Sequence, residues 1–127
     1  MHEDKLYHYA VIRWVPRVER EEFFNIGLIL FCKSAKYIRF EYHLCPDKFR
    51  LMGSETDYEE VIESLETHRH IANGANGYGP IAELDIPDRF RWLTAVRSSV
   101  IQASPVRTGK TSDLDKTFTR LFEELVV

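Results

Sequence analysis

The sequence predicts an α+β fold, in which a mainly antiparallel four-stranded sheet carries two main helices on one face. Three strand-like segments follow one another in the first third of the chain with only short links between them. A helix-opening pattern comes next, and an amphipathic stripe closes the chain. The predicted order is β-β-β-α-α-β-α, which is typical of the α+β class. A length of 127 residues matches one domain, so residues 1–127 are expected to form a single domain.

The first and third strands are predicted from alternation. Residues 6–15 alternate between two faces, and Pro16 ends the strand because proline has no backbone N–H to donate to a ladder. Residues 36–44 place Ile38 and Phe40 inward and charged residues outward. Short connections to the segment between them predict an antiparallel meander.

The second strand, residues 23–32, contains the longest apolar run of the chain, interrupted by Asn25 and Gly27. Both faces of such a strand need cover, so it is expected to be the central strand. Asn25 and Gly27 are two positions apart and are expected on the same face. A polar amide and a missing side chain weaken a strand interior, so a hydrogen bond or a close neighbour should compensate there.

The rest of the chain is expected to supply the helices and one more strand. A capping box at residues 56–59 predicts a helix that ends at Asn73 and Gly74, followed by a glycine-rich loop. A short helix is expected from Pro87 to Leu93, a fourth strand at residues 98–103 and a turn at residues 104–111. The last helix begins at residues 112–115, and its apolar stripe consists of Leu114, Phe118, Leu121, Phe122 and Leu125.

Composition excludes several classes of protein. The net charge is −3, so nucleic-acid binding is not the function expected of this chain. The first residues do not resemble a secretion signal, and no apolar run has the length of a membrane span. Cys32 and Cys45 are too few for a secreted disulfide scaffold. A reduced cytoplasmic protein that does not enter the membrane is therefore expected.

Motifs that would indicate a cofactor, metal or catalytic site fail on context. Residues 109–111 read Gly-Lys-Thr, but a phosphate-binding loop needs a glycine where Ser104 stands, and acidic residues follow where a phosphate would bind. His43 and Cys45 share a strand face but make at best half of a zinc site. No nucleophile lies beside a histidine by local pattern. We therefore predict no metal and no cofactor and lean against an enzyme, and the sequence identifies no catalytic residue.

The arginines indicate a binding site more directly. Residues 89–110 contain five basic and no acidic residues, whereas residues 55–66 contain six acidic and no basic residues. If the fourth strand pairs beside one of the first two, as many as six guanidinium groups converge, including Arg17, and guanidinium groups suit phosphate and carboxylate. The alternative is that these arginines pair within the chain with acids such as Glu19 and Glu21, and that the tryptophans are core residues. The predicted anion-binding or partner-binding residues are Arg13, Arg20, Glu22, Asn25, Arg91, Trp92, Arg97, Ser98, Ser104, Arg107 and Thr108.

Three blocks of sequence resemble the bacterial domain-of-unknown-function family 3037. They are residues 9–16 (Tyr-Ala-Val-Ile-Arg-Trp-Val-Pro), residues 20–27 (Arg-Glu-Glu-Phe-Phe-Asn-Ile-Gly) and the stretch 89–109. Positions that match the pattern of that family are Arg13, Pro16, Glu22, Asn25, Gly27, Trp92, Arg97, Ser98, Ser104, Pro105, Thr108 and Gly109. The resemblance implies a short bacterial protein without an established activity, encoded beside a HipA-like kinase.

Two functions follow as expectations. The first is an accessory or regulatory protein that acts by protein–protein interaction, with a HipA-like kinase as the partner implied by the resemblance. The second is a small-molecule sensor or enzyme that binds a phosphorylated or nucleotide-like ligand among the arginines. An exposed edge strand would in addition favour a homodimer.

Overall fold

A computed structural model of the chain describes residues 3–20, 22–53, 56–95 and 99–127. Its strands are β1 (Lys5–Trp14), β2 (Phe24–Cys32), β3 (Tyr37–Tyr42), β4 (Ile101–Ala103) and β5 (Arg107–Thr111). Its α-helices are α1 (Pro46–Met52), α2 (Tyr58–Ala72), α3 (Ile86–Leu93) and α4 (Leu114–Leu125), and two short 3-10 helices are η1 (Val18–Arg20) and η2 (Pro80–Glu83).

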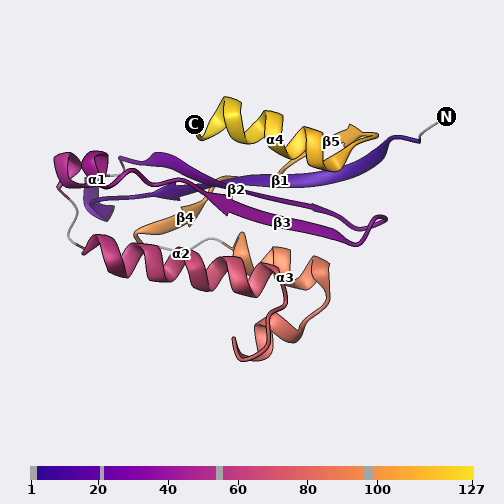
Figure 1. The fold of residues 1–127 in the computed structure, drawn as a ribbon, viewed down its shortest axis with the longest axis horizontal. Helices are drawn as coiled ribbons and strands as arrows, with labels where there is room; N and C mark the ends of the chain where they lie inside the picture. Colours follow the sequence, from indigo (N-terminus) through magenta and orange to yellow (C-terminus); the bar gives the residue numbers. More distant parts are fainter. Residues whose placement is uncertain (1–2, 21, 54–55, 96–98) are drawn as a thin grey trace.

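The strands form one antiparallel sheet in the order β3-β2-β1, and both β4 and β5 pair with the remaining edge of β1. This arrangement confirms the predicted α+β class. The sheet is sandwiched between helices: α2 and α3 cover one face, and α4 covers the other (Figure 1). The prediction that both main helices pack on one face is therefore wrong for α4.

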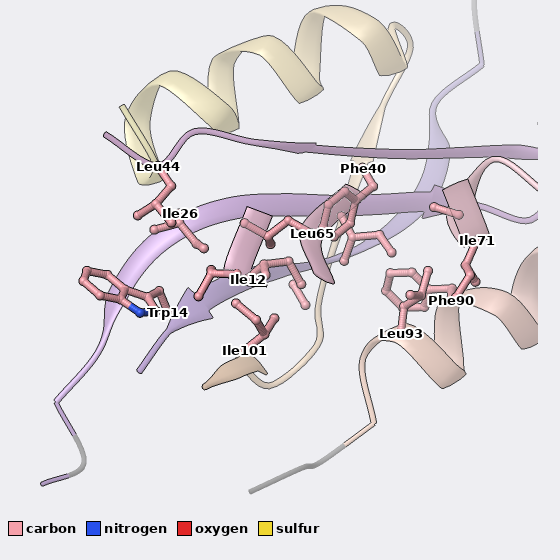
Figure 2. Close-up of a cluster of buried hydrophobic side chains, with 14 of the residues drawn as sticks. Ile12, Trp14, Ile26, Phe40, Leu44, Leu65, Ile71, Phe90, Leu93 and Ile101 are labelled. Carbon is pink, nitrogen blue, oxygen red and sulfur yellow. The ribbon is translucent and has the colours of Figure 1, made fainter. Parts of the chain in front are cut away.

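Two clusters of buried side chains explain why both faces are covered. One cluster lies between the sheet and α2 and α3, where Ile12 and Ile26 meet Leu65, Phe90 and their neighbours (Figure 2). The second cluster lies under α4 and consists of Tyr7, Leu28, Leu30, Cys32, Phe118 and Leu121. Because neighbouring residues of β2 belong to different clusters, β2 is apolar on both faces, as predicted for a central strand.

A β-bulge at Ile26 corrects the predicted placement of Asn25. Ile12 pairs with Gly27, but the next residue of β1, Arg13, pairs with Asn25. Since neighbouring residues of a strand point to opposite faces, Asn25 and Gly27 also lie on opposite faces. The close neighbour expected at Gly27 is present, because an added Cβ there would be 3.0 Å from the Glu41 carbonyl oxygen.

The segment predicted as a turn after the fourth strand is in fact β5. Together, β4 and β5 run along β1 as one strand that is interrupted at residues 104–106. At the interruption Ser104 replaces the missing ladder bond: its Oγ accepts a hydrogen bond from the Val11 N–H at 2.9 Å. Further along, the Tyr7 ring lies across Gly109, where an added Cβ would be 2.5 Å from Tyr7 Cζ. A glycine covered by an aromatic ring is tolerated in such an edge strand.

Candidate functional site

Arg13 is the central residue of the candidate site. Its neighbours Ile12 and Trp14 are buried under α2 and α3, so the Arg13 side chain leaves the sheet on the α4 side. Asn25 on β2 and Gln102 on β4 are its partners in register. The guanidinium carbon of Arg13 lies 4.1 Å from the centre of the Phe23 ring, and Phe23 is 48% exposed. The site therefore combines a stacked guanidinium group with an exposed aromatic ring.

The charge of Arg13 is not neutralised within the part of the chain that the structure describes. Its Nε is buried there without a hydrogen-bond acceptor, and the described carboxylates form no ion pair with it. Burying part of a guanidinium group without an acceptor is costly unless a ligand or partner supplies one. Arg13 thus has the properties of a residue that binds an anionic group from outside the chain.

Arg17 and Arg20, at this end of the sheet, are also without carboxylate partners among the described residues. Arg17 and Arg20 follow β1 and are exposed, and the Arg17 Nε donates a hydrogen bond to the Gly53 carbonyl oxygen at 3.4 Å. The arginines that do form ion pairs within the described ranges are Arg39, Arg50, Arg69, Arg91 and Arg120. Of these, Arg50 lies on α1 near this end of the sheet, where it pairs with Asp47. Among the described residues, Arg91 pairs within the chain, though with Asp88, whereas Arg13, Arg17 and Arg20 do not; Glu21, one of the acids named in the intramolecular alternative, lies outside the described residues.

We define the arginine face as Arg13, Arg17, Arg20, Phe23 and Asn25. It lies at the end of the sheet where β1 leads through η1 into β2 (Figure 1). Glu22, another predicted site residue, is exposed in the same connection. The face presents three guanidinium groups, one amide and one aromatic ring.

The structure does not bring the remaining described residues of the predicted site to this face. Arg91 and Trp92 belong to α3, on the opposite side of the sheet, so the predicted convergence of six guanidinium groups does not include Arg91. Trp92 packs against the core cluster, as the alternative interpretation expected. Arg97 and Ser98 lie outside the described residues, and their predicted roles stay predictions.

Arg107 and Thr108 are exposed on β5, where they pair with Tyr9 and His8 in the middle of β1. Arg107 pairs with Tyr9, which is four residues before Arg13 on β1, so the two arginine backbones are roughly 13 Å apart along the strand. At that separation, a single phosphate or carboxylate group cannot contact both guanidinium groups unless both side chains extend far toward it. An extended partner can contact both.

Ser104 has a structural role that its residue type did not reveal. It is buried, its hydroxyl accepts from Val11 and donates to the Pro105 carbonyl oxygen at 3.1 Å, and its N–H donates to the Val11 carbonyl oxygen at 2.8 Å. These bonds use the hydroxyl group within the fold. Nothing in this arrangement presents Ser104 to a ligand.

Sequence reasoning missed a groove of about 510 Å³ between β3 and α4. Its walls include Arg39, His43, Phe118, Phe122 and Glu123. A cavity of about 210 Å³ next to it shares His43 and Val127 with the groove and is lined on its far side by Asn25 and Lys48. No local signal marks these residues, because β3 and α4 are separated by most of the chain. Through Asn25 the hollow reaches the arginine face.

The shifted pKa values lie around β3 and not at the arginine face. Burial, reinforced by a hydrogen bond to Asp115, raises the pKa of Tyr37 to about 12. Burial and a 2.8 Å hydrogen bond to Glu66 raise the pKa of Tyr42 to about 12 as well. The Arg69 guanidinium beside Glu66 lowers the pKa of that carboxyl group. These networks join α4 and α2 to β3, and we interpret their hydrogen bonds and ion pairs as structural.

The described residues contain neither a metal-binding cluster nor a membrane-spanning helix. Within residues 3–20, 22–53, 56–95 and 99–127, no three or more His, Cys, Asp or Glu side chains are grouped closely enough to hold a metal ion. Among these residues, too, no helix has the length and apolar character needed to span a membrane. Cys32 is buried and Cys45 is exposed, and neither forms a disulfide.

Comparison with known proteins gives one match. The sequence model of a family described as "Protein of unknown function (DUF3037)" matches residues 9–126. No curated protein and no solved structure matches the chain. The match extends over the arginine face, the groove and β5.

Proposed function

Because the chain belongs to the DUF3037 family, whose description assigns no activity, we propose a function from the surface: this protein is a non-catalytic accessory protein that binds a protein partner through the arginine face. The observation that carries the proposal is the set of guanidinium groups without carboxylate partners in the described chain, beside an exposed phenylalanine. Arginine and aromatic side chains are enriched in the residues that contribute most to protein interfaces.

The chemistry of this face indicates an acidic partner surface. A carboxylate of the partner can accept two parallel hydrogen bonds from one guanidinium group, which favours arginine over lysine in such contacts. Phe23 supplies apolar area next to Arg13, so desolvation of the charge coincides with burial of the ring. An acidic surface with an apolar centre is therefore the complement of the arginine face.

A bacterial HipA-like kinase, the partner implied by the family resemblance, is the first candidate, and the proposal places both proteins in the cytoplasm. Isothermal titration of the purified kinase into this protein tests the pairing at low and at high salt. We expect binding that weakens as salt is raised, because exposed charges are screened. We also expect about tenfold weaker binding by a double variant, Arg17→Ala with Arg20→Ala. Binding whose affinity changes neither with salt nor in the double variant would contradict a role for the arginine face.

A second function, an anion sensor, is favoured by one observation. Arg13 and Asn25 are paired in register, and Asn25 lines the cavity of about 210 Å³. A phosphate or nucleotide that binds there would raise the unfolding midpoint, because a ligand selective for the folded state stabilises it. A thermal shift with phosphate and with nucleotides, but none with the kinase, would favour the sensor. The opposite result would favour the partner.

A further inference from the structure

We propose that the outer edge of β5 is a strand-addition site for an extended acidic segment of a partner protein. This inference rests on the proposed function, since the segment belongs to a partner, and it assigns a second contact at the other end of β1. β5 pairs with β1 on one side and is a terminal strand of the sheet. Its first two residues, Arg107 and Thr108, are exposed, and so is Lys110.

The directions of the β5 backbone groups follow from two hydrogen bonds of β1 and its extension. The Ser104 N–H donates to the Val11 carbonyl oxygen at 2.8 Å, and the Val15 N–H donates to the Val100 carbonyl oxygen at 2.7 Å. Odd-numbered residues of β1 therefore direct their backbone groups toward β4 and β5. In β5, Gly109 and Arg107 pair with Tyr7 and Tyr9, so their backbone N–H and C=O groups point toward β1. The N–H and C=O groups of Thr108 and Lys110 therefore point away from the sheet.

The opposite edge of the sheet, β3, is protected. The His43 N–H donates to the Ile26 carbonyl oxygen at 2.7 Å, which places the backbone groups of Phe40 on the outer side of β3. Phe40 is nevertheless only 1% exposed. Arg69 on α2 lies 3.3 Å from Glu41, whose side chain leaves β3 on the α4 side, so this ion pair passes around the edge. Charged side chains that block an edge prevent strand pairing there.

The chemistry of β5 specifies the segment that fits it. Arg107 lies on the α4 face and Lys110 on the other, and neither forms an ion pair with a described carboxylate. Leu6, the register partner of Lys110, is 50% exposed. An added strand would place residues three positions apart beside Arg107 and Lys110, one on each face of the sheet, so two acidic residues at that spacing with apolar residues between them match these groups. A second copy of β5 does not match, because the Arg107 and Lys110 side chains of one copy would then lie beside those of the other copy.

Nuclear magnetic resonance with a probe peptide tests this site. The probe is acetyl-Thr-Glu-Val-Thr-Glu-Val-Thr-amide, whose two Glu residues are three positions apart and so point to opposite faces, and the control peptide has Lys in place of each Glu. We expect the acidic probe to shift the amide signals of Thr108 and Lys110 and to slow their exchange, while the lysine peptide leaves both unchanged. Absence of these changes with the acidic probe at saturating or millimolar concentration would overturn the proposal.

Two variants show whether the backbone edge and its charge are responsible. Thr108→Pro removes an outward N–H without removing a bond to β1, since proline is tolerated where the N–H faces solvent. We expect about tenfold weaker probe binding, with an unfolding midpoint that shows a folded protein. Lys110→Glu should weaken binding of the acidic probe and strengthen binding of the lysine peptide. Unchanged probe affinity in both variants would refute strand addition.

Kinase titrations separate this inference from the proposed function. If Arg13→Ala weakens binding of the kinase and Thr108→Pro does not, the arginine face stands and strand addition is refuted for that partner. If Thr108→Pro weakens kinase binding and Arg13→Ala does not, β5 is the contact and the proposed role of the arginine face fails.

Discussion

Replacement of Ser104 by alanine tests whether the hydroxyl group of this residue holds the interruption between β4 and β5. The hydroxyl accepts from the Val11 N–H at 2.9 Å, and both residues are buried. Alanine keeps the backbone bond to Val11 but leaves the Val11 N–H without an acceptor. A buried donor that loses its partner costs roughly 1–3 kcal/mol of unfolding free energy. For a domain of this size that corresponds to a fall in Tm on the order of 4 °C per kcal/mol.

Urea unfolding followed by circular dichroism measures this free energy, and Ser112→Ala is the matched control because Ser112 is exposed in the turn before α4. We expect the control to stay within about 0.5 kcal/mol of the natural protein. We also expect an unchanged denaturant slope for Ser104→Ala, since the fold is retained. Equal stability of the two variants would refute the hydrogen bond to Val11 as a source of stability and would return Ser104 to the set of ligand candidates.

Three further predictions concern other parts of the fold. Glu66→Gln should reduce the pH dependence of stability: the lowered Glu66 pKa stabilises the protein above about pH 4.3, the ordinary glutamate value, and this contribution is lost as pH falls through the folded pKa. Urea midpoints at neutral and acidic pH should therefore differ less in the variant; an equal difference would contradict the Arg69 contact. Gly109→Ala should lower the unfolding free energy by roughly 1–3 kcal/mol, because its Cβ meets the Tyr7 ring, and calorimetry showing no change would contradict that contact. A thiol reagent should modify Cys45 in the folded protein and Cys32 only after unfolding; rapid reaction at both would show that β2 is less covered than described.

The elements that the sequence predicted well have strong local patterns. The apolar run of β2 and the stripe of α4 both lie where predicted, because each pattern indicates which faces must be buried. The pattern of β2 shows that both faces need cover, but it does not show which helix covers which face. That assignment depends on the path of the chain after β5, and α4 accordingly lies on the face that was not predicted (Figure 1).

β5 was mistaken for a turn because Arg-Thr-Gly-Lys-Thr has neither apolar alternation nor strong β-propensity. It is a strand because of a distant residue, Tyr7, whose ring covers Gly109. The bulge at Ile26 is invisible in sequence for a similar reason, since it depends on the register between β1 and β2. Long-range pairing therefore accounts for both errors.

The candidate site was predictable where its residues lie close in sequence. Arg13, Arg17 and Arg20 surround one turn of the chain, so their shared location follows from the strand order. The side of the sheet on which α3 carries Arg91 is a property of helix packing and could not be predicted from charge. The burial of Ser104 likewise depends on Val11, which is 93 residues away in sequence.

Affinity of the Arg13→Ala variant for the HipA-like kinase tests the central claim most directly, with Arg120→Ala as the matched control. Arg120 pairs with Glu124 on α4 at 3.5 Å, whereas Arg13 has no carboxylate partner among the described residues. We predict about tenfold weaker binding for Arg13→Ala and unchanged binding for Arg120→Ala, with both variants folded. Equal affinity of the two variants, or no binding of the kinase by the natural protein, would contradict the account.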